Sequence, residues 1–280
     1  MKKNLIKPIT FIPIYNCKKQ ILRLIDKFSS LDKQILKMYG CLVFVDNKST
    51  DGTLDACKNK LQKRNLNYVI IENEQNYGFG GSHKVAFNLF LKSDFTHLFI
   101  FHGDDQGDLY DISKFYEVLT QNISLECILG SRFMKESKTD GYSKFRIIGN
   151  ILFNILFSIS VNKSIKDMGA GFNCFSRKFS EKKLYKECDN DLTFNYYLTS
   201  HIFLNIETTK IKFVPINWYE KDQISNVKLI SQSFNLFSII LKTFFLRKTF
   251  VQHCAKKNFF NKQKSSMVFA KNKKLERLKI

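Results

Sequence analysis

The sequence predicts an α/β protein with a mostly parallel central sheet and helices on both of its faces. Short apolar runs typical of buried strands alternate along the chain with stretches in which apolar residues recur at helical spacing. Each apolar run in the first half ends abruptly in polar residues, and 44% of all residues are hydrophobic, which is enough for a core. Such an alternation of strand and helix is typical of parallel sheets.

The first hundred residues supply these elements in order. The predicted strands are Ile9–Ile14, Cys41–Val45, Tyr68–Ile71 and His97–Phe101. The predicted helices are Lys18–Phe28, Thr53–Leu61 and a third that follows the glycine-rich loop Asn76–Gly81 and ends at Leu91. Ligands of parallel sheets bind at the carboxyl ends of the strands. We therefore expect the polar residues after the four strands to converge on one site.

An acidic cluster follows the last of these strands. Asp104, Asp105 and Asp108 lie within five positions, with the amide of Gln106 between them. Magnesium prefers oxygen ligands and is commonly held by one or two carboxylates together with substrate phosphates. The cluster favours a metal site for a phosphorylated ligand, and a solvated acidic loop is the alternative.

The chain is strongly basic, with 45 Lys and Arg against 25 Asp and Glu, a net charge of +20. This balance indicates an anionic partner, either nucleic acid or an anionic membrane face. No nucleic-acid-binding motif is present, so we expect a peripheral membrane surface and no nucleic acid. The seven cysteines include no CxxC pair, which argues against a zinc site and a disulfide framework.

Two apolar stretches bear on the membrane question. Phe145–Val161 is interrupted by Asn150 and Asn154, and we expect it to be too short to span a bilayer and to form a buried or an interfacial helix. Leu229–Val251 is rich in phenylalanine, and nine Lys or Arg and one Glu follow from residue 254 onward. We expect a domain over residues 1–228 and an amphipathic helix with a basic tail over 229–280. The helix and its basic tail bind an anionic membrane surface, or else the helix packs on the domain and is followed by a disordered basic end.

Four motifs in order resemble the signatures of family 2 glycosyltransferases with the GT-A fold: IPIYN at 12–16, VDNKSTDGT at 45–53, NYGFGGS at 76–82 and HGDDQGD at 102–108. Three further segments resemble the polyprenol-phosphate branch, which includes dolichol-phosphate mannosyltransferases: GSRF at 130–133, DMGAGF at 167–172, and VPI at 214–216 followed by ISNVK at 224–228. The resemblance covers residues 9–230.

This resemblance implies roles on the donor side of the site. Pro13, Tyr15 and Asp46 hold the base and ribose of a UDP- or GDP-sugar, and Asp105 and Gln106 contact the sugar or the metal. Asp104 falls on the second acid of the D-x-D motif and binds Mg²⁺ or Mn²⁺. His102 replaces the first acid of that motif, and an imidazole ligand favours the softer Mn²⁺. Asn47 replaces the second acid of the D-D pair.

The resemblance also implies roles on the acceptor side. Arg132 and Lys228 are candidates to bind phosphate oxygens, and the planar fork of arginine suits this task. Asp167 acts as general base if the acceptor is a hydroxyl group. A phosphate acceptor is already ionised and needs no base, in which case Asp167 positions other groups.

These observations predict an inverting, metal-dependent glycosyltransferase that transfers a sugar to a polyprenyl phosphate. We expect it in the cytoplasm, peripheral on the inner face of the plasma membrane. One alternative is transfer to a hydroxyl of a lipid-linked or surface glycan, such as lipopolysaccharide or capsule. A non-catalytic basic membrane-binding module is the alternative from another class.

Overall fold

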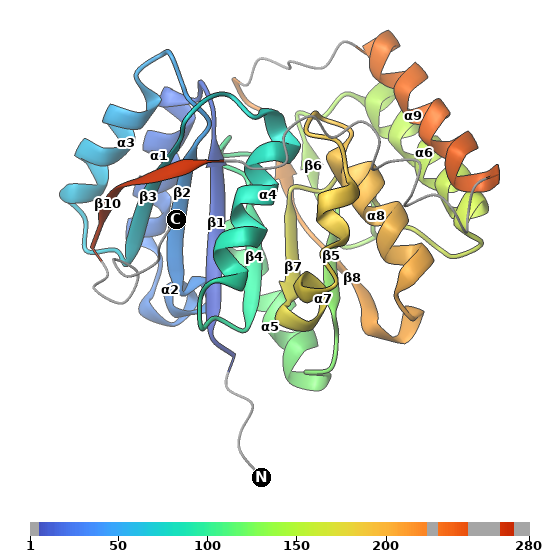
Figure 1. Cartoon of the computed structure of the whole chain (residues 1–280), viewed down its shortest axis with the longest axis horizontal. Coiled ribbons are helices and arrows are strands. Elements are labelled where there is room, and N and C mark those ends of the chain that lie inside the picture. The colour runs from blue at the N-terminus through green and yellow to red at the C-terminus, as the bar shows by residue number, and fades with distance from the viewer. Residues whose placement is uncertain (1–5, 223–228, 246–263, 272–280) are drawn as a thin grey trace.

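A mixed sheet of eight strands forms the centre of the molecule (Figure 1). The computed structural model describes residues 6–222, 229–245 and 264–271. The strand order is β10-β3-β2-β1-β4-β7-β5-β8. The strands are β1 (Pro8–Ile14), β2 (Cys41–Asp46), β3 (Tyr68–Asn73), β4 (His97–Phe101), β5 (Cys127–Ser131), β7 (Phe172–Ser176), β8 (Ile211–Pro215) and β10 (Ser265–Ala270).

Within this sheet only β7 and β10 run against the others, as far as the described residues go. β7 pairs antiparallel with β4 and β5, and β10 pairs antiparallel with β3, whereas the remaining pairs are parallel. A second sheet of two short parallel strands joins β6 (Thr139–Asp140) to β9 (Trp218–Tyr219). The predicted α/β class with a mostly parallel sheet is confirmed.

Helices cover both faces of the sheet because successive strand residues point to opposite sides. One hydrophobic core lies under α1 (Lys18–Ser30), α2 (Lys33–Tyr39), α3 (Thr53–Gln62) and α5 (Ile112–Gln121). The other lies under α4 (Gly78–Leu91), α6 (Lys144–Val161), α7 (Arg177–Glu181), α8 (Phe194–Asn205) and α9 (Leu229–Phe245). Short 3₁₀ turns occupy Leu109–Asp111, Leu184–Glu187 and Thr208–Lys210.

The loops after β1, β2, β3 and β4 converge, as the strand pattern predicts. The backbone N–H of Gly103 donates to the carbonyl of Pro13 at 3.2 Å, and that of Asn47 donates to Ile14 at 3.0 Å. The side-chain amide of Asn47 donates to Asn76 Oδ1 at 2.7 Å. Gly103 has no room for a side chain, since a Cβ there would lie 2.7 Å from the Pro13 oxygen. The four loops therefore form one edge of the molecule.

The carboxyl-terminal region departs from the expected helix and basic tail. Leu229–Phe245 does form a helix, but Ser265–Ala270 forms strand β10 and extends the sheet beside β3. The local sequence pattern does not indicate this strand, because edge pairing with β3 is a long-range contact that such a pattern does not record. Residues 223–228 lie outside the described part of the chain, and so does Lys228. The division at residue 228 stays a prediction.

Helix α6 begins one residue before the predicted stretch, at Lys144. Its 18 residues have a mean hydropathy of 1.4 and meet the length and composition of a membrane span, which corrects the expectation that this stretch is too short. The helix contacts α8 and α9, so one of its sides packs against the protein (Figure 1). Exposed apolar side chains cover its other side: Phe145, Ile148, Ile151, Leu152, Ile155 and Ile159.

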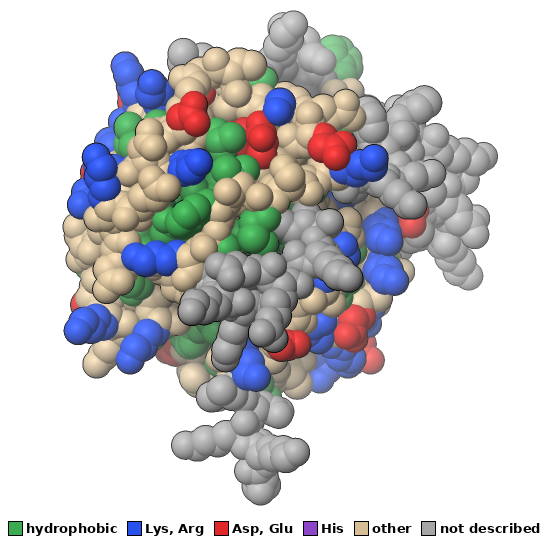
Figure 2. All heavy atoms as spheres, turned by 60° about the vertical axis from the view of Figure 1, so that its left-hand side comes forward, with side chains coloured by type: hydrophobic (Ala, Val, Ile, Leu, Met, Phe, Trp, Pro, Cys, Tyr) green, Lys and Arg blue, Asp and Glu red, His purple; other side chains and the backbone are tan. Residues whose placement is uncertain are grey.

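Figure 2 shows the molecule with its α1 and α3 side brought forward. Lys and Arg side chains are spread over this face and interspersed with acidic ones, around a hydrophobic area. The net charge of +20 is thus not gathered into one patch in this view.

Candidate active site

The acidic turn after β4 directs its neighbouring carboxylates to different places. Asp105 has a positive φ of 61°, an uncommon conformation for a non-glycine residue. Its fully buried carboxylate lies against α1, where it accepts hydrogen bonds from Arg23 Nε at 3.0 Å and Lys27 Nζ at 2.5 Å. Arg23 also donates both terminal nitrogens to the carboxylate of Asp222, at 2.7 and 3.0 Å. One arginine thus ties the acidic turn to the segment that follows β9.

Asp104, the preceding residue, is half-buried. Its Oδ1 accepts the backbone N–H of Gln106 at 3.2 Å. Burial raises the pKa of the Asp104 carboxyl to about 6, and the neighbouring Asp105 adds to this effect. Burial also lowers the pKa of His102 to about 3, with smaller contributions from His83 and Arg132, so the imidazole is neutral at physiological pH.

Asp104 and His102 would be the protein ligands of a divalent cation that also binds substrate phosphates. Among the described residues, no group of three or more His, Cys, Asp or Glu could hold a metal by itself. Asp104 supplies a carboxylate, and His102 Nε2 is a buried nitrogen with no hydrogen-bond partner in the described chain. One or two protein ligands completed by phosphate oxygens is the usual Mg²⁺ arrangement. Asp105 is unsuited to the metal because its oxygens already bind two cations.

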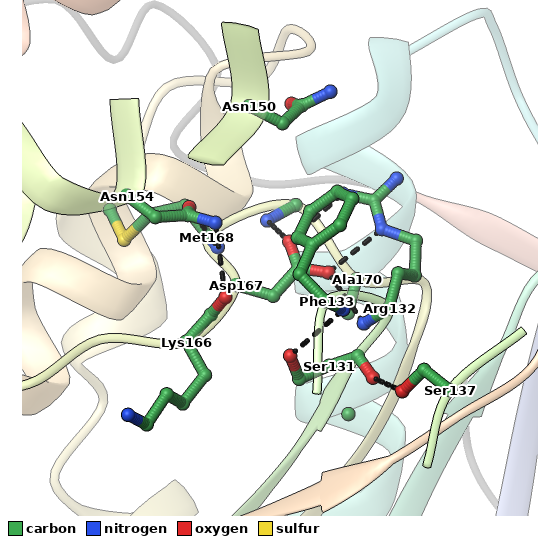
Figure 3. Close-up of polar contacts among 12 residues, drawn as sticks. Ser131, Arg132, Phe133, Ser137, Asn150, Asn154, Lys166, Asp167, Met168 and Ala170 are labelled. Carbon is green, nitrogen blue, oxygen red and sulfur yellow. Dashed lines mark hydrogen bonds and ion pairs between the residues drawn. The ribbon is translucent and has the colours of Figure 1, made fainter. Parts of the chain in front are cut away.

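Arg132 and Asp167 form a buried ion pair on the other side of the site. The carboxylate of Asp167 accepts Arg132 Nε at 2.8 Å and Nη2 at 2.9 Å. It also accepts the backbone N–H groups of Arg132 and Gly169, at 3.0 and 2.9 Å (Figure 3). Burial alone would lower the pKa of Arg132, but the charge and hydrogen bonds of Asp167 hold that pKa above its ordinary value.

Aromatic rings surround the Arg132 guanidinium. Its carbon lies 5.0 Å from the ring centre of Phe133, 5.8 Å from Tyr142 and 5.7 Å from Trp218. Cation–π attraction at these distances is strengthened by desolvation. The His102 ring also lies 6.5 Å from that of Trp218, so this tryptophan stands between the acidic turn and the arginine. The predicted catalytic residues Asp104, Arg132 and Asp167 are therefore parts of one region.

The loops after β1 and β2 build the side of the site where a nucleotide is expected. Asp46 is buried, and its Oδ2 accepts the Ser49 N–H at 2.9 Å while its Oδ1 has no partner in the described residues. Burial raises the pKa of Asp46 despite the hydrogen bonds from Ser49. Pro13 is half-buried, and Tyr15 is 43% exposed at the rim. These three residues occupy the loop edge where the resemblance places a base and ribose.

Asn47 belongs to the scaffold of the glycine-rich loop. Its Oδ1 accepts from Asn73 Nδ2 and from the backbone N–H of Tyr77, both at 2.9 Å, while its Nδ2 donates to Asn76. The side-chain amide uses both a donor and an acceptor here, which a carboxylate cannot do. This explains why asparagine suits the position where the family motif has an acid.

Sequence reasoning missed several residues that shape the site. Arg23 and Lys27 sit on an ordinary amphipathic helix, and only the fold brings them to Asp105. Tyr142 lies between the motifs, and nothing in the sequence indicated a role for it in the site. Gln106 is half-buried beside β9, where its backbone carbonyl accepts the Tyr219 N–H at 2.8 Å. The predicted contacts of Asp105 and Gln106 with the sugar stay predictions.

Comparison with known proteins gives the family of this chain. The model of Glycosyl transferase family 2 matches residues 10–184, and the chain belongs to this family. It is a glycosyltransferase, and the family expected from the sequence motifs is confirmed.

A curated relative is the dolichyl-phosphate beta-glucosyltransferase of Saccharomyces cerevisiae. It is 27% identical over 235 residues, which cover 75% of this chain. The match spans 66% of the length of the yeast protein.

Solved structures with the same fold include two synthases. Glucosyl-3-phosphoglycerate synthase from Mycobacterium tuberculosis in complex with UDP has a TM-score of 0.57 at 13% identity, covering 86% of this chain and 80% of that one. Mannosyl-3-phosphoglycerate synthase from Rubrobacter xylanophilus has a TM-score of 0.57 at 12% identity, covering 92% and 77%. The likeness confirms the GT-A fold.

The two ion pairs that Asp105 forms with Arg23 and Lys27, here called the Asp105 clamp, predict the effect of removing Arg23. In the variant Arg23→Met the buried Asp105 carboxylate loses one of its two cationic donors, which is expected to cost about 1–3 kcal/mol of unfolding free energy. Arg64→Met is the matched control, since Arg64 is as exposed as Arg23 but pairs with the half-exposed Asp26. Its cost is expected to stay below about 1 kcal/mol. Urea unfolding measures both, and equal losses would contradict the clamp.

The raised pKa of Asp104 predicts a pH-dependent stability. The folded-state value of about 6 exceeds the ordinary value of 3.8, so the protonated carboxyl favours the fold below pH 3.8. This contribution is lost as the pH rises through about 6. Asp104→Asn cannot ionise and is expected to raise Tm in metal-free buffer above pH 7, with little change near pH 4. A Tm shift of the same size at both pH values would refute this explanation.

Proposed function

We propose that the protein is an inverting glycosyltransferase that moves a sugar from a UDP- or GDP-sugar to a polyprenyl phosphate at the cytoplasmic membrane face. The observation that carries this proposal is the hydrogen bonding of Asp167. Its two oxygens accept four N–H groups, two from the Arg132 side chain and two from the backbone. A carboxylate has about four lone-pair positions, so all of them are in use.

A carboxylate in this state is a poor general base. Taking a proton would force Asp167 to give up bonds to Arg132, whose buried charge would then lose its counterion. An acceptor hydroxyl needs such a base, whereas a phosphate monoester is already ionised at neutral pH. The geometry therefore favours a phosphate acceptor and a positioning role for Asp167.

Arg132 has a free donor for that phosphate. Nε and Nη2 bind Asp167, while Nη1 makes no hydrogen bond with the described part of the chain. In Figure 3 this end of the guanidinium points away from Asp167. Charge-assisted bonds from arginine to phosphate are among the strong hydrogen bonds of proteins. Lys228 is proposed as a second phosphate contact and lies outside the described residues.

The donor occupies the loop edge in this proposal. Asp46 Oδ1 is a buried acceptor without a partner in the described chain, which suits an N–H group of a nucleotide base. Pro13 and Tyr15 are proposed as further contacts of the base and ribose, and Asp105 and Gln106 as contacts of the sugar or the metal. A divalent ion held by Asp104 and His102, Mg²⁺ or Mn²⁺, would stabilise the negative charge of the departing diphosphate.

The chemical step is a single displacement. A phosphate oxygen of the acceptor attacks the anomeric carbon, and the bond from that carbon to the diphosphate oxygen breaks. The nucleoside diphosphate leaves with the bonding electron pair, and the configuration at the anomeric carbon inverts. Arg132 orients the attacking phosphate, and no proton needs to be removed from it.

The apolar surface of α6 and α9 supports a peripheral membrane location. The two helices pack together, and α9 exposes Phe234, Phe237, Leu241, Phe244 and Phe245 next to the apolar side of α6. Exposed apolar patches of this kind mark interaction or membrane sites. Lys144 and Lys166 are exposed near α6, and the sequence after residue 254 is basic, which suits an anionic leaflet.

The relatives agree with this choice. The name of the yeast relative specifies a dolichyl phosphate, which is a polyprenol-type acceptor. One of the Mycobacterium tuberculosis structures holds Mn²⁺, UDP-glucose and glycerol 3-phosphate.

A transfer assay tests the proposal. Purified protein is given UDP- and GDP-sugars with Mg²⁺ or Mn²⁺ and polyprenyl phosphate in detergent, and nucleoside diphosphate release is followed beside Asp104→Ala. Lipid-dependent release that this variant abolishes is the expected result. Release driven by a glycan acceptor instead of the lipid would move the assignment to a hydroxyl acceptor. If the protein binds no nucleotide sugar, the non-catalytic membrane-binding module becomes the favoured function.

Arg132→Lys tests the acceptor contact. Lysine keeps the charge but loses the planar fork, so it cannot bind Asp167 through two nitrogens and also reach the phosphate. Loss of a charge-assisted bond predicts a rise in KM for polyprenyl phosphate of about 10- to 100-fold. KM for the nucleotide sugar is expected to stay within a factor of about two, because the loops after β1 and β2 are untouched. A rise confined to the donor KM would argue against this role.

The membrane surface is tested with vesicles containing phosphatidylglycerol. In the double variant Ile148→Glu and Phe234→Glu, two exposed apolar side chains of α6 and α9 become charged. Each buried apolar side chain is worth about 1.5–3 kcal/mol, so co-sedimentation should fall more than about tenfold. Ile123→Glu, on an exposed site before β5, is the control and should bind as the wild type does. Equal binding by all three proteins would place the membrane contact elsewhere.

A further inference from the structure

Helix α6 has a polar stripe that its apolar composition does not explain. Asn150, Asn154 and Ser158 follow one another at intervals of four residues and therefore share one face of the helix. All three side chains bond to groups outside the helix. Asn150 Nδ2 donates to Tyr142 Oη at 3.0 Å, and Ser158 Oγ accepts the Ile165 N–H at 2.9 Å.

Asn154 makes the most specific of these contacts. Its Nδ2 donates to the carbonyl of Lys166 at 3.0 Å, and its Oδ1 accepts the N–H of Met168 at 3.1 Å. The side-chain amide thus holds the backbone on both sides of Asp167. Figure 3 shows Asn154 on α6 reaching this segment, with Asp167 directed to Arg132.

The contact is well suited to fix an orientation. Asn154 is 6% exposed and uses one donor and one acceptor in opposite senses on residues 166 and 168. If either bond of a buried amide is left unmade, the unpaired group costs its full desolvation penalty. The segment is therefore held in one position, and the Asp167 side chain points from it to Arg132.

We infer that Asn154 is a positioning residue that sets the direction of Arg132 toward the acceptor phosphate through Asp167. Asn150 supports the same arrangement, because Tyr142 is one of the aromatic rings beside the guanidinium. The polar face of α6 builds the surroundings of Arg132, and the opposite face is the apolar surface described above. This inference rests on the proposed function of Arg132 as the acceptor contact.

Two substitutions at Asn154 test the inference in the full-length protein. Asn154→Leu has a similar size and removes both bonds. Asn154→Asp keeps the acceptor but sets a carboxylate oxygen against the Lys166 carbonyl. Both are expected to raise KM for polyprenyl phosphate about tenfold or more, since misplacement by about 1 Å can cost about 100-fold. KM for the nucleotide sugar and the slow hydrolysis of the donor should not change.

A pH comparison separates positioning from general damage. A protonated aspartic acid again offers one donor and one acceptor, so the deficit of Asn154→Asp relative to the wild type should shrink at pH 5 and that of Asn154→Leu should not. Thr243→Val is the control, since the buried Thr243 hydroxyl donates only to Ile239 within α9 among the described residues. It should leave both KM values unchanged.

The two hypotheses fail in different ways. If the wild-type protein transfers no sugar to polyprenyl phosphate, the proposed function falls. If the wild type transfers sugar and the Asn154 variants match Thr243→Val, the positioning role is overturned. Equal increases of the donor and acceptor KM in both Asn154 variants, with no recovery of Asn154→Asp at pH 5, would also overturn it.

Discussion

The buried ion pair between Arg132 and Asp167 is the interaction on which the proposed acceptor side of this molecule depends. A charge removed from water costs several kcal/mol unless its partner and its remaining hydrogen bonds are in place. Here the Asp167 carboxylate is fully hydrogen-bonded, and aromatic rings surround the guanidinium. Gly169 permits the approach, because a Cβ there would lie 3.1 Å from Arg132 Nη2. The pair fixes one cation while leaving Nη1 for a ligand.

The fold brings this pair to the side of the acidic turn by means of β7, the internal antiparallel strand of the described sheet. β7 lies between β4, which ends at the acidic turn, and β5, which ends just before Arg132. β4 and β5 thus run in the same direction and deliver Asp104 and Arg132 to the same edge of the sheet. Arg23 adds a second tie, because it joins Asp105 to Asp222. The acidic turn and the ion pair therefore lie at the same edge of one sheet.

Much of the first half of the fold could be predicted from the sequence, because its strands and helices are local patterns with clear ends. The convergence of the loops after β1 to β4 followed from the geometry of parallel sheets, and the contacts of Asn47 and Gly103 confirm it. The pairing of β10 with β3 could not be predicted in the same way, since edge pairing joins segments almost two hundred residues apart.

The site shows the same division between local and long-range information. Motifs located Asp104, Arg132 and Asp167, but the positive φ of Asp105 sends its carboxylate to α1, and no motif records that direction. Asn154 appeared in the sequence only as an interruption of an apolar helix. Its structural role depends on the segment around Asp167, which folds back onto α6.

The most direct test of the account is calorimetric titration of the protein with farnesyl phosphate and with farnesol, which share an apolar chain and differ in the phosphate. The account predicts that farnesyl phosphate binds at least about tenfold more tightly than farnesol, and that Arg132→Lys removes most of this difference. Equal affinity for the two compounds, or a preference for phosphate that Arg132→Lys leaves intact, would contradict the assignment of Arg132 and Asp167 to a phosphate acceptor.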